Sequence, residues 1–412
     1  MSTGWKDAIW PGCHNLNEAA SLTMAVRSHL GMALLLPAVL LVAITVIYPF
    51  LMIVSNSFVN STGPSTLHRT TELITKWQDD APVDETLRKA LTEDLLTAQM
   101  SRSLSRVALA LENEQYGLRE LLTRTGNELR QQADRGQTLD LFAAAADWQD
   151  VKWWRALKRG LSPYTFTHLL HVVDYYYDST GQLAEVPDNQ AIFLAALQRT
   201  VIISIAVTVL CMLLAYPISW VLSSGSRRWQ SFMLVCVLLP FWTSLLVRTS
   251  AWIVLLQRQG VLNDMLLALG FSSDRLQLIY NRTGVLIAMV HILLPFMILP
   301  IYAAMNNIPR FQIRAGLSLG ASPVTVFRRV FLPQTVPGLR TGTVIVFVMA
   351  LGFYITPALV GSPSDQMIAG FISIYLNERL DWATASSLAI LLSSTMAIGY
   401  LLIHLAGKVL QR

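Results

Sequence analysis

The chain has 412 residues and a formal net charge of +5; 53% of its residues are hydrophobic and only 14% are charged. Soluble domains usually carry about 25% charged residues, so this composition excludes an ordinary water-soluble protein and indicates long segments in lipid. The three cysteines, Cys13, Cys211 and Cys236, show neither the spacing of a metal site nor that of a disulfide framework.

The charges are distributed unevenly along the chain. The stretch from Asn56 to Gln198 holds 19 acidic and 14 basic residues, whereas the remainder holds 7 acidic and 17 basic residues. Membrane helices joined by cationic cytoplasmic loops produce such an apolar and basic remainder. We therefore expect a water-exposed middle segment within an otherwise lipid-embedded protein.

Six apolar runs are long enough to cross a bilayer, which takes about 20 residues. In chain order they are Gly31 to Val54, Thr200 to Leu222, Phe232 to Leu256, Val285 to Met305, Val336 to Val360, and Ala385 to Leu405. Backbone amides in hydrocarbon must be paired within their own segment, so each run is predicted to be a helix. The predicted fold class is an all-α integral membrane protein with six transmembrane helices and a mainly helical soluble insert between the first and second.

The beginning of the chain is predicted to form a cytoplasmic tail (1–29) followed by the first transmembrane helix (30–55). The apolar run is too long for a signal peptide and no small-residue cleavage site follows it, so we expect it to remain as an anchor.

The insert, residues 56–162, is predicted to be periplasmic and mostly helical. Apolar residues recur at helical spacing from Leu67 to Gln132, which indicates a long helix or a helical hairpin, with Pro82 at a first helical position. A second helical stretch is expected from Leu139 to Leu157.

An aromatic patch in the insert, Trp148, Trp153 and Trp154, is interpreted as the core of a small domain, the alternative being interfacial anchors. The basic residues that follow are interpreted as a solvated helix face rather than a lipid-binding surface; they are Lys152, Arg155, Lys158 and Arg159. His168 and His171 lie close together but lack further ligands, so no metal site is predicted.

Loop charges predict the orientation of the chain. Arginines cluster between the second and third runs and again between the fourth and fifth, at Arg227, Arg228, Arg310, Arg314, Arg328 and Arg329. If six helices alternate, these loops and both termini lie on one side, which the positive-inside rule makes the cytoplasm. Arg248 lies roughly 30 Å of helix beyond Arg228, near the outer interface, where it is either an anchor or a functional group.

The loop between the fourth and fifth runs, residues 306–335, has the signals of two short helices joined by a sharp turn. Pro309 is expected to open the first helix and Gly320 to end it. Ser322 is expected to cap the second helix, with Pro323 at its first position and Pro333 at its end. A rigid, capped hairpin with an apolar face suits docking against a partner, the alternative being that it packs only on its own bundle.

This loop resembles the signature loop of binding-protein-dependent ABC permeases. The matching residues are Ala315, Gly320, Ala321, Ser322, Phe327, Val330, Leu332, Pro333, Pro337 and Gly338. Two positions differ, since Arg314 stands where the family has Glu and Gly316 where it has a second Ala. The resemblance implies an ATPase-coupling loop formed by Arg314, Ala315, Gly316, Leu319, Gly320, Ala321, Ser322, Pro323, Phe327, Leu332 and Pro333.

Two further stretches, residues 239–249 and 352–361, resemble the spermidine/putrescine branch of these permeases. The resemblance implies a type I permease core over residues 163–412 and a translocation path near Trp242, Arg248, Tyr354 and Pro357. It does not extend to the insert.

The resemblance also implies the partners: a second permease subunit, two ATPase subunits, a periplasmic substrate-binding protein and membrane lipid, without nucleic acid. No phosphate-binding loop occurs in the chain, so no bound cofactor and no catalytic residue is predicted, and ATP and Mg²⁺ would be bound by the ATPase. The chain is thus expected to be a bacterial inner-membrane transport subunit rather than an enzyme.

The implied solute is a small organic compound, a polyamine or a relative of one, moved by alternating access. The six runs contain no Asp or Glu, so selection of a polycation is expected to lie in the binding protein. The alternatives are a secondary transporter, which would need ion-coupling residues in its spans, and a membrane receptor that senses through the insert.

Overall fold

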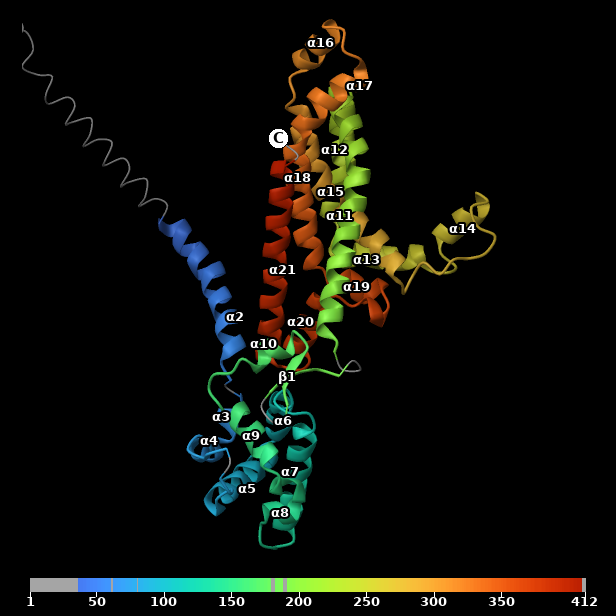
Figure 1. The fold of residues 1–412 in the computed structure, drawn as a ribbon. Coiled ribbons are helices and arrows are strands. Elements are labelled where there is room, and N and C mark those ends of the chain that lie inside the picture. The colour runs from blue at the N-terminus through green and yellow to red at the C-terminus, as the bar shows by residue number, and fades with distance from the viewer. Residues whose placement is uncertain (1–35, 61, 80, 179–181, 188–190, 410–412) are drawn as a thin grey trace, which may run out of the picture. The chain divides into compact units, whose positions relative to one another are not determined.

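The computed structural model describes residues 36–60, 62–79, 81–178, 182–187 and 191–409. Within these residues the chain is helical apart from one two-stranded sheet (Figure 1). The prediction of an all-α protein is therefore confirmed. The chain divides into two compact units, Met1–Ser55 and Asn56–Arg412. The predicted tail, residues 1–29, lies outside the described residues.

The first predicted span forms a helix over Leu36–Phe58, with a mean hydropathy of 2.5. It contains a π turn at Ala43–Ile47, followed by α2 (Tyr48–Phe58). None of its most apolar window is buried, so its surface suits lipid or another membrane helix.

The insert folds as a bundle of short helices around its own core. Its elements are α3 (Thr62–Thr66), α4 (His68–Ile74), α5 (Glu85–Met100), α6 (Leu104–Leu111), α7 (Leu118–Asp134), α8 (Leu141–Ala144), a 3₁₀ turn (Ala146–Gln149) and α9 (Val151–Gly160). The core runs from Leu67 to Leu161, and the predicted leucine stripe is buried within it. Periodic leucines have this effect because they give each helix one apolar face.

Left-handed backbone positions break the insert into several helices where the sequence predicted one long helix or a hairpin. Arg102 (φ 58°) separates α5 from α6, and Gly117 (φ 88°) precedes α7. Contrary to the prediction, Pro82 does not begin a helix; α5 begins later, at Glu85, after the extended residue Asp84. The predicted helix from Leu139 to Leu157 is likewise interrupted, by the extended residues Ala145 and Asp150.

Two tryptophans form the centre of the insert. Trp148 and Trp154 are fully buried and their rings meet edge to face, 5.3 Å apart. The Trp148 indole donates to the Thr125 hydroxyl (2.9 Å), and the Trp154 indole donates to the Trp148 carbonyl (2.8 Å). The interpretation of these two residues as core is confirmed.

A short connection leads from the insert to the second span. It consists of α10 (Thr167–His171) and an antiparallel hairpin of β1 (Tyr175–Tyr177) and β2 (Leu183–Glu185), in which Tyr175 pairs with Glu185. The buried Asp174 carboxylate accepts hydrogen bonds from the amides of Phe193 (3.2 Å) and Leu194 (2.8 Å). Asp174 therefore caps the N-terminus of the next helix, which begins at Phe193, although Asp174 itself lies outside that helix.

After the hairpin, the helices of the second unit are α11 (Phe193–Ser224), α12 (Arg227–Leu238), α13 (Leu245–Leu256), α14 (Val261–Ala268), α15 (Arg282–Asn306), α16 (Arg310–Ser318), α17 (Pro323–Val326), α18 (Leu332–Leu351), α19 (Ile355–Val360), α20 (Ile368–Asn377) and α21 (Trp382–Val409). The most central is α15, whose apolar window is 61% buried. It packs between α11 and α18, and α21 packs on α18 (Figure 1).

The third predicted span, Phe232 to Leu256, is not one straight helix. Residues Arg227–Trp242 and Leu245–Leu256 meet at 98°. Leu239–Trp242 tightens into a 3₁₀ turn around Pro240, and the Ser244 hydroxyl then caps α13 by accepting from the Val247 amide (3.2 Å). Among the described residues, five helices, with this bent pair as a sixth, are long and apolar enough to cross a membrane.

The fifth predicted span, Val336 to Val360, also differs from a single helix. It stops at Leu351, and Gly352–Tyr354 separates α18 from the short α19. At its other end the helix starts earlier than predicted, because Pro323–Leu351 forms one 29-residue helical segment.

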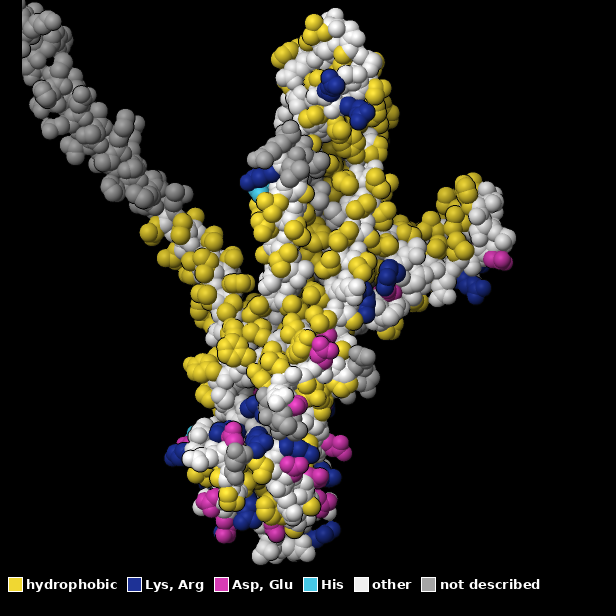
Figure 2. Space-filling model, in the orientation of Figure 1, with side chains coloured by type: hydrophobic (Ala, Val, Ile, Leu, Met, Phe, Trp, Pro, Cys, Tyr) yellow, Lys and Arg dark blue, Asp and Glu magenta, His cyan; other side chains and the backbone are white. Residues whose placement is uncertain are grey.

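The surface of the second unit changes in character along its length. Hydrophobic side chains cover the helices from α11 to α21, whereas Lys, Arg, Asp and Glu gather on the insert (Figure 2). The elbow of α16 and α17 lies at the end of α11 and α15 opposite to the insert (Figure 1). An apolar band therefore separates the insert from the elbow in this unit.

Candidate functional site

The elbow between α15 and α18 is built by the local signals that the sequence predicted. Gly320 has φ 82°, in the left-handed region. The Gly320 amide donates to the Leu317 carbonyl (3.0 Å) and the Ala321 amide to the Gly316 carbonyl (3.2 Å). This pair of bonds is a Schellman ending, which satisfies the last carbonyls of α16.

The second half of the elbow starts at Ser322, as predicted. Its hydroxyl accepts from the Thr325 amide (3.2 Å), and Pro323 occupies the first turn of α17. The two halves are in close contact, since a Cβ added at Gly316 would lie 3.1 Å from a methyl group of Val326. Gly316, where the family usually has alanine, thus allows α16 and α17 to approach closely.

The prediction that Pro333 ends the second helix is wrong. Residues Phe327–Phe331 form a π turn, in which the Leu332 amide donates to the Phe327 carbonyl, and the helix continues into α18. In a regular α-helix the ring of a proline clashes with the carbonyl four residues earlier. The wider π turn lies directly before Pro333 and accommodates it.

One face of α16 is apolar and exposed. Phe311 is 69% exposed and Leu319 is 87% exposed, and Ala315 lies between them at helical spacing. Arg310 and Arg314 lie next to this face, both on the same side of the helix. An isolated apolar residue at a surface is ordinary, but several on one face of a capped helix indicate a contact surface.

Behind the elbow lies a cavity of about 450 Å³ between the ends of α11 and α15 and the two elbow helices. Trp220, Phe327 and Phe331 form an aromatic wall, with centroids of Trp220 and Phe327 6.1 Å apart and the rings of Phe327 and Phe331 stacked at 5.7 Å. The side-chain amide of Gln334 on α18 donates a hydrogen bond to the side-chain oxygen of Gln312 on α16 (2.8 Å) and so joins these two helices. The elbow is therefore fixed to the membrane helices rather than loosely tethered.

The predicted path residues lie around the bend of the third span and the break of the fifth. Trp242 is 81% exposed at the bend, and Tyr354 is 42% exposed at the start of α19, where Pro357 is buried. The hydroxyls of Thr249 and Thr356 lie 3.2 Å apart and join α13 to α19. This contact places Arg248 and Pro357 on neighbouring helices.

Not all of the residues predicted to line the path contact one another. Among the described residues, no hydrogen bond or ring contact joins Trp242 to Tyr354, and the Arg248 Nε is buried without a hydrogen-bond partner. Trp252, one turn beyond Arg248, donates to the His291 ring (3.1 Å) and so joins α13 to α15. The role of these residues in transport stays a prediction.

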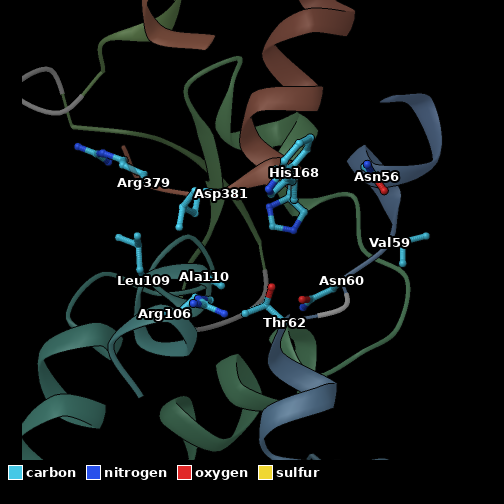
Figure 3. A pocket seen from close by; sticks show the side chains of 13 residues that line it. Asn56, Val59, Asn60, Thr62, Arg106, Leu109, Ala110, His168, Arg379 and Asp381 are labelled. Atoms are coloured by element: carbon cyan, nitrogen blue, oxygen red, sulfur yellow. The ribbon is translucent and has the colours of Figure 1, made fainter. Parts of the chain in front are cut away.

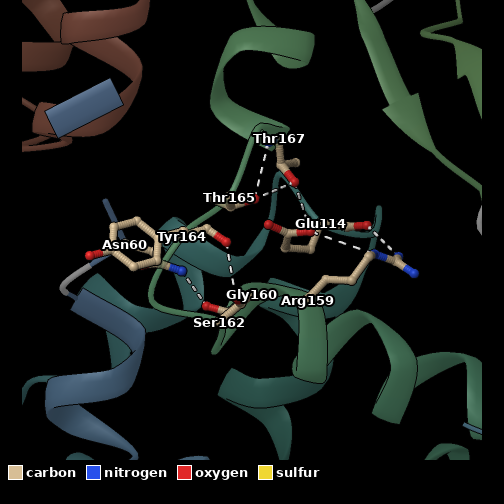
Figure 4. Close-up of polar contacts among 8 residues, drawn as sticks. All are labelled: Asn60, Glu114, Arg159, Gly160, Ser162, Tyr164, Thr165 and Thr167. Atoms are coloured by element: carbon tan, nitrogen blue, oxygen red, sulfur yellow. Dashed lines mark hydrogen bonds and ion pairs between the residues drawn. The ribbon is translucent and has the colours of Figure 1, made fainter. Parts of the chain in front are cut away.

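A buried polar cluster joins the turn after α6, which carries Glu114, to Arg159 on α9 and Thr167 at the start of α10 (Figure 4). Glu114 is 2% exposed; its carboxylate lies 3.7 Å from Arg159 and accepts from the Thr167 hydroxyl (3.2 Å). Burial raises the pKa of Glu114 to about 7, although Arg159 and Thr167 act in the opposite direction. The Asn60 side chain donates to the Gly160 carbonyl beside it.

The basic residues of α9 differ from the solvated face that the sequence suggested. Lys158 pairs with Asp79 (2.8 Å), Lys152 with Asp150 (3.0 Å) and Arg159 with the buried Glu114. Lys158 and Arg159 therefore join α9 to other segments of the insert, whereas the pair formed by Lys152 is local.

His168 and His171 lie on α10, in the connection between the insert and the second span, where His168 is buried and His171 is half-buried. No group of three His, Cys, Asp or Glu side chains that could hold a metal occurs in the described part of the chain. Burial lowers the pKa of His168, and it lowers the pKa of His171 to about 4.

Comparison with known families locates the resemblance in the membrane helices. The model of the family described as binding-protein-dependent transport system inner membrane component matches residues 191–412. This match runs from α11 to the end of the chain and includes the elbow. It leaves out the insert.

Curated relatives match the same region. The spermidine/putrescine transport system permease protein PotB of Escherichia coli (strain K12) is 29% identical over 222 residues, which cover 54% of this chain and 80% of that protein. PotB of Haemophilus influenzae is 32% identical, over 50% of this chain and 72% of that protein. The inner membrane ABC transporter permease protein YdcU of E. coli is 35% identical, over 40% and 56%.

A solved structure, a bacterial alginate ABC transporter in complex with an alginate pentasaccharide-bound periplasmic protein, matches with a TM-score of 0.43 and 18% identity, over 53% of this chain and 80% of that chain. The family model covers more than half of the chain, and the matched helices form a bundle that carries the capped elbow. The chain therefore belongs to the inner-membrane components of binding-protein-dependent transport systems.

Proposed function

We propose that this permease subunit imports a small polyamine, of the spermidine or putrescine type, powered by separate ATPase subunits. The curated relatives named as spermidine/putrescine permeases support the substrate class. The chain would pair with a second permease, and a periplasmic binding protein would deliver the solute. ATP and Mg²⁺ would be bound by the ATPases.

The elbow is the observation that carries this proposal. Its capped turn, its connection to the bundle through Gln312 and Gln334, and the exposed face of Phe311, Ala315 and Leu319 suit a helix that seats in a groove of a partner. We infer that this face contacts the ATPase. Because Arg314 replaces the acidic residue usual in the family, an ion pair with the ATPase at this position would have the opposite polarity.

The orientation follows from the charges at the two ends of the bundle. The elbow carries Arg310, Arg314, Arg328 and Arg329, and the turn between α11 and α12 carries Arg227 and Arg228. The positive-inside rule then places the elbow and both termini in the cytoplasm and the insert, residues 56–162, in the periplasm. There the insert is positioned to contact the binding protein.

The path is proposed to run beside α13 and α19, near Trp242, Arg248, Tyr354 and Pro357. The exposed Trp242 and Tyr354 rings can contact an organic cation through their faces. The candidate spans contain no Asp or Glu, so they offer no carboxylate that would trap a polycation. Selection would then rest mainly with the binding protein, and the path would let the solute pass.

The experiment compares Leu319→Glu with Leu139→Glu in the complete transporter reconstituted in vesicles. Both leucines are exposed, but Leu319 lies on the elbow and Leu139 in the insert. We expect Leu319→Glu to reduce ATPase co-purification and ATP-dependent spermidine uptake by more than tenfold, and Leu139→Glu to leave both unchanged.

Uptake that continues without ATPase subunits would contradict the importer and favour a secondary transporter. If ATPase coupling holds but spermidine and putrescine neither enter nor stimulate ATP hydrolysis, the substrate assignment is wrong and the coupling role stands.

A further inference from the structure

A cavity of about 210 Å³ lies where the insert meets the first turn of α21. Its walls come from segments far apart in the chain: Asn60 after α2, Thr62 at the start of α3, Arg106 on α6, His168 on α10, and Asp381 directly before α21 (Figure 3). The side chain of Asn113 donates to the Thr384 hydroxyl (3.4 Å) nearby, which joins the insert to α21. The family match starts at residue 191, so most of this cavity lies outside it.

His168 lacks the partners that a buried imidazole needs. Its side chain is among the buried residues, at 3% exposure, and both ring nitrogens are buried without a hydrogen-bond partner among the described residues. Figure 3 shows the ring beside the space that Asn60, Thr62 and Asp381 surround. Buried polar atoms in folded proteins are nearly always bonded to protein, water or ligand. The ring is therefore placed to bond something that occupies the cavity.

The charges around the cavity suit a group with an anionic part. Arg106 lines the cavity and, among the described residues, has no carboxylate within salt-bridge distance. Arg379 at the rim donates to the Tyr375 hydroxyl (3.1 Å) and also has no carboxylate partner in the described chain. Guanidinium groups bind phosphate oxygens especially well.

Asp381 adds one negative charge to the same space. One of its oxygens caps α21 by accepting from the Thr384 amide (3.0 Å). A purely anionic ligand would be repelled by this carboxylate, whereas a ligand that also carries an ammonium group would be attracted by it. The arrangement is complementary to a phosphate and an ammonium group separated by a few bonds.

The position of the cavity indicates where such a ligand comes from. Trp382, which also lines it, is 58% exposed at the start of the last span. Tryptophans at the ends of spans lie at the level of lipid headgroups.

We propose that this cavity binds the phosphoethanolamine headgroup of a phospholipid, with Arg106 and His168 donating to the phosphate and Asp381 accepting from the ammonium group. The bound headgroup would link the insert to α21. This site does not depend on the proposed substrate or on the ATPase.

The test measures lipid retained by the purified chain, using native mass spectrometry after reconstitution in phosphatidylethanolamine, phosphatidylcholine or phosphatidylglycerol. We expect phosphatidylethanolamine to be retained about tenfold better than the others, because phosphatidylcholine has no ammonium hydrogen to donate and phosphatidylglycerol has no cation. Arg106→Gln and Asp381→Asn should each reduce this preference about tenfold, and the side-chain oxygen that Asp381→Asn retains can still cap α21. The control is Arg130→Gln, since Arg130 is an exposed arginine of α7 that does not line the cavity.

A second arm titrates delipidated protein with soluble phosphoethanolamine and with inorganic phosphate. Binding of phosphoethanolamine that Arg106→Gln and Asp381→Asn weaken supports the site, and if no lipid is retained it identifies a soluble ligand as the source. Equal retention of the three lipids together with no binding of phosphoethanolamine would overturn the proposal and leave a water-filled cavity.

Discussion

The insert and the membrane bundle use the same apolar residues in opposite ways. Leu91, Leu95 and Leu122 of the insert are fully buried, whereas Leu401 and Leu402 of α21 are 54% and 61% exposed. The insert surrounds its leucines with charged surface, and the bundle has an apolar surface instead (Figure 2). Leucine is buried where the solvent is water and exposed where the solvent is lipid, so exposure alone does not measure how well a helix is folded.

The two regions also differ in how their helices are held together. The insert relies on large side chains such as Trp148 and Trp154. In the bundle, α15 and α18 approach so closely that a Cβ added at Gly338 would lie 2.5 Å from the Pro300 carbonyl oxygen. Helices in lipid gain little from burying apolar area and instead depend on close backbone packing.

The largest loss of stability is expected from a substitution in the core of the insert. Trp148→Ala should destabilise the insert by about 3–5 kcal/mol, since it removes a fully buried indole together with its hydrogen bond to the Thr125 hydroxyl. Hydrogen exchange of the insert amides in the full chain should become more than about a hundredfold faster. Trp242→Ala is the matched control, because Trp242 is 81% exposed in the bundle and its loss should not change that exchange. Equal effects of both changes would contradict the comparison.

The next effect is a pH dependence confined to the insert and its connection to α21. The pKa of Glu114 is raised from 4.5 to about 7, so its contribution to stability is present below pH 4.5 and is lost as the pH rises through 7. The pKa of His171 is lowered from 6.5 to about 4, so its contribution is present above pH 6.5 and is lost as the pH falls through 4. The two contributions change stability with pH in opposite directions where their windows overlap, between pH 4.5 and 6.5.

Two variants separate the contributions of Glu114 and His171 to the pH dependence of stability. Glu114→Gln should make the full chain less stable at pH 5 than at pH 7, because the histidine contribution then acts alone. His171→Gln should shift the pH dependence in the opposite direction. The Glu114 contribution is at most roughly 3 kcal/mol, and thermal unfolding followed by tryptophan fluorescence at several pH values would measure it. Identical pH profiles in the two variants and the parent chain would show that neither group titrates as described.

The smallest effect concerns the packing of the bundle. Gly338→Ala should cost about 1–3 kcal/mol, because the added methyl group meets the backbone of α15. Gly370→Ala on α20 is the control, since an added Cβ there has no neighbour within 4 Å. The thermal stability of the protein in lipid nanodiscs should fall for the first change alone. A comparable fall for Gly370→Ala would mean that helix packing is not the cause.

The elbow shows which features can be predicted from sequence. Gly320, Ser322 and Pro323 act through their immediate neighbours, and the structure places them as those local rules require. Pro333 was misjudged because its effect depends on the π turn before it, and such a turn has no sequence signature. The bend at Thr243 and Ser244 was missed because hydropathy averages over Pro240 within a long apolar run.

The contacts between distant segments could not be predicted. The insert helices were expected from their leucine spacing, but their breaks depend on Arg102 and Gly117 in left-handed conformations, and Arg102 is not a residue that suggests one. The cavity beside His168 combines residues 60 and 381, which no local pattern relates. Trp220 at the end of its span was an available signal for the cavity behind the elbow, since aromatic residues often mark such ends.

The π turn before Pro333 has a mechanical consequence. It leaves Pro323–Leu351 as one rod of 29 residues, about 43 Å long at 1.5 Å per residue. If the elbow is displaced in transport, this helix would transmit the displacement as far as Gly352–Tyr354, where the helix ends. The segment beside Tyr354 would then be the first point at which the membrane helix can bend.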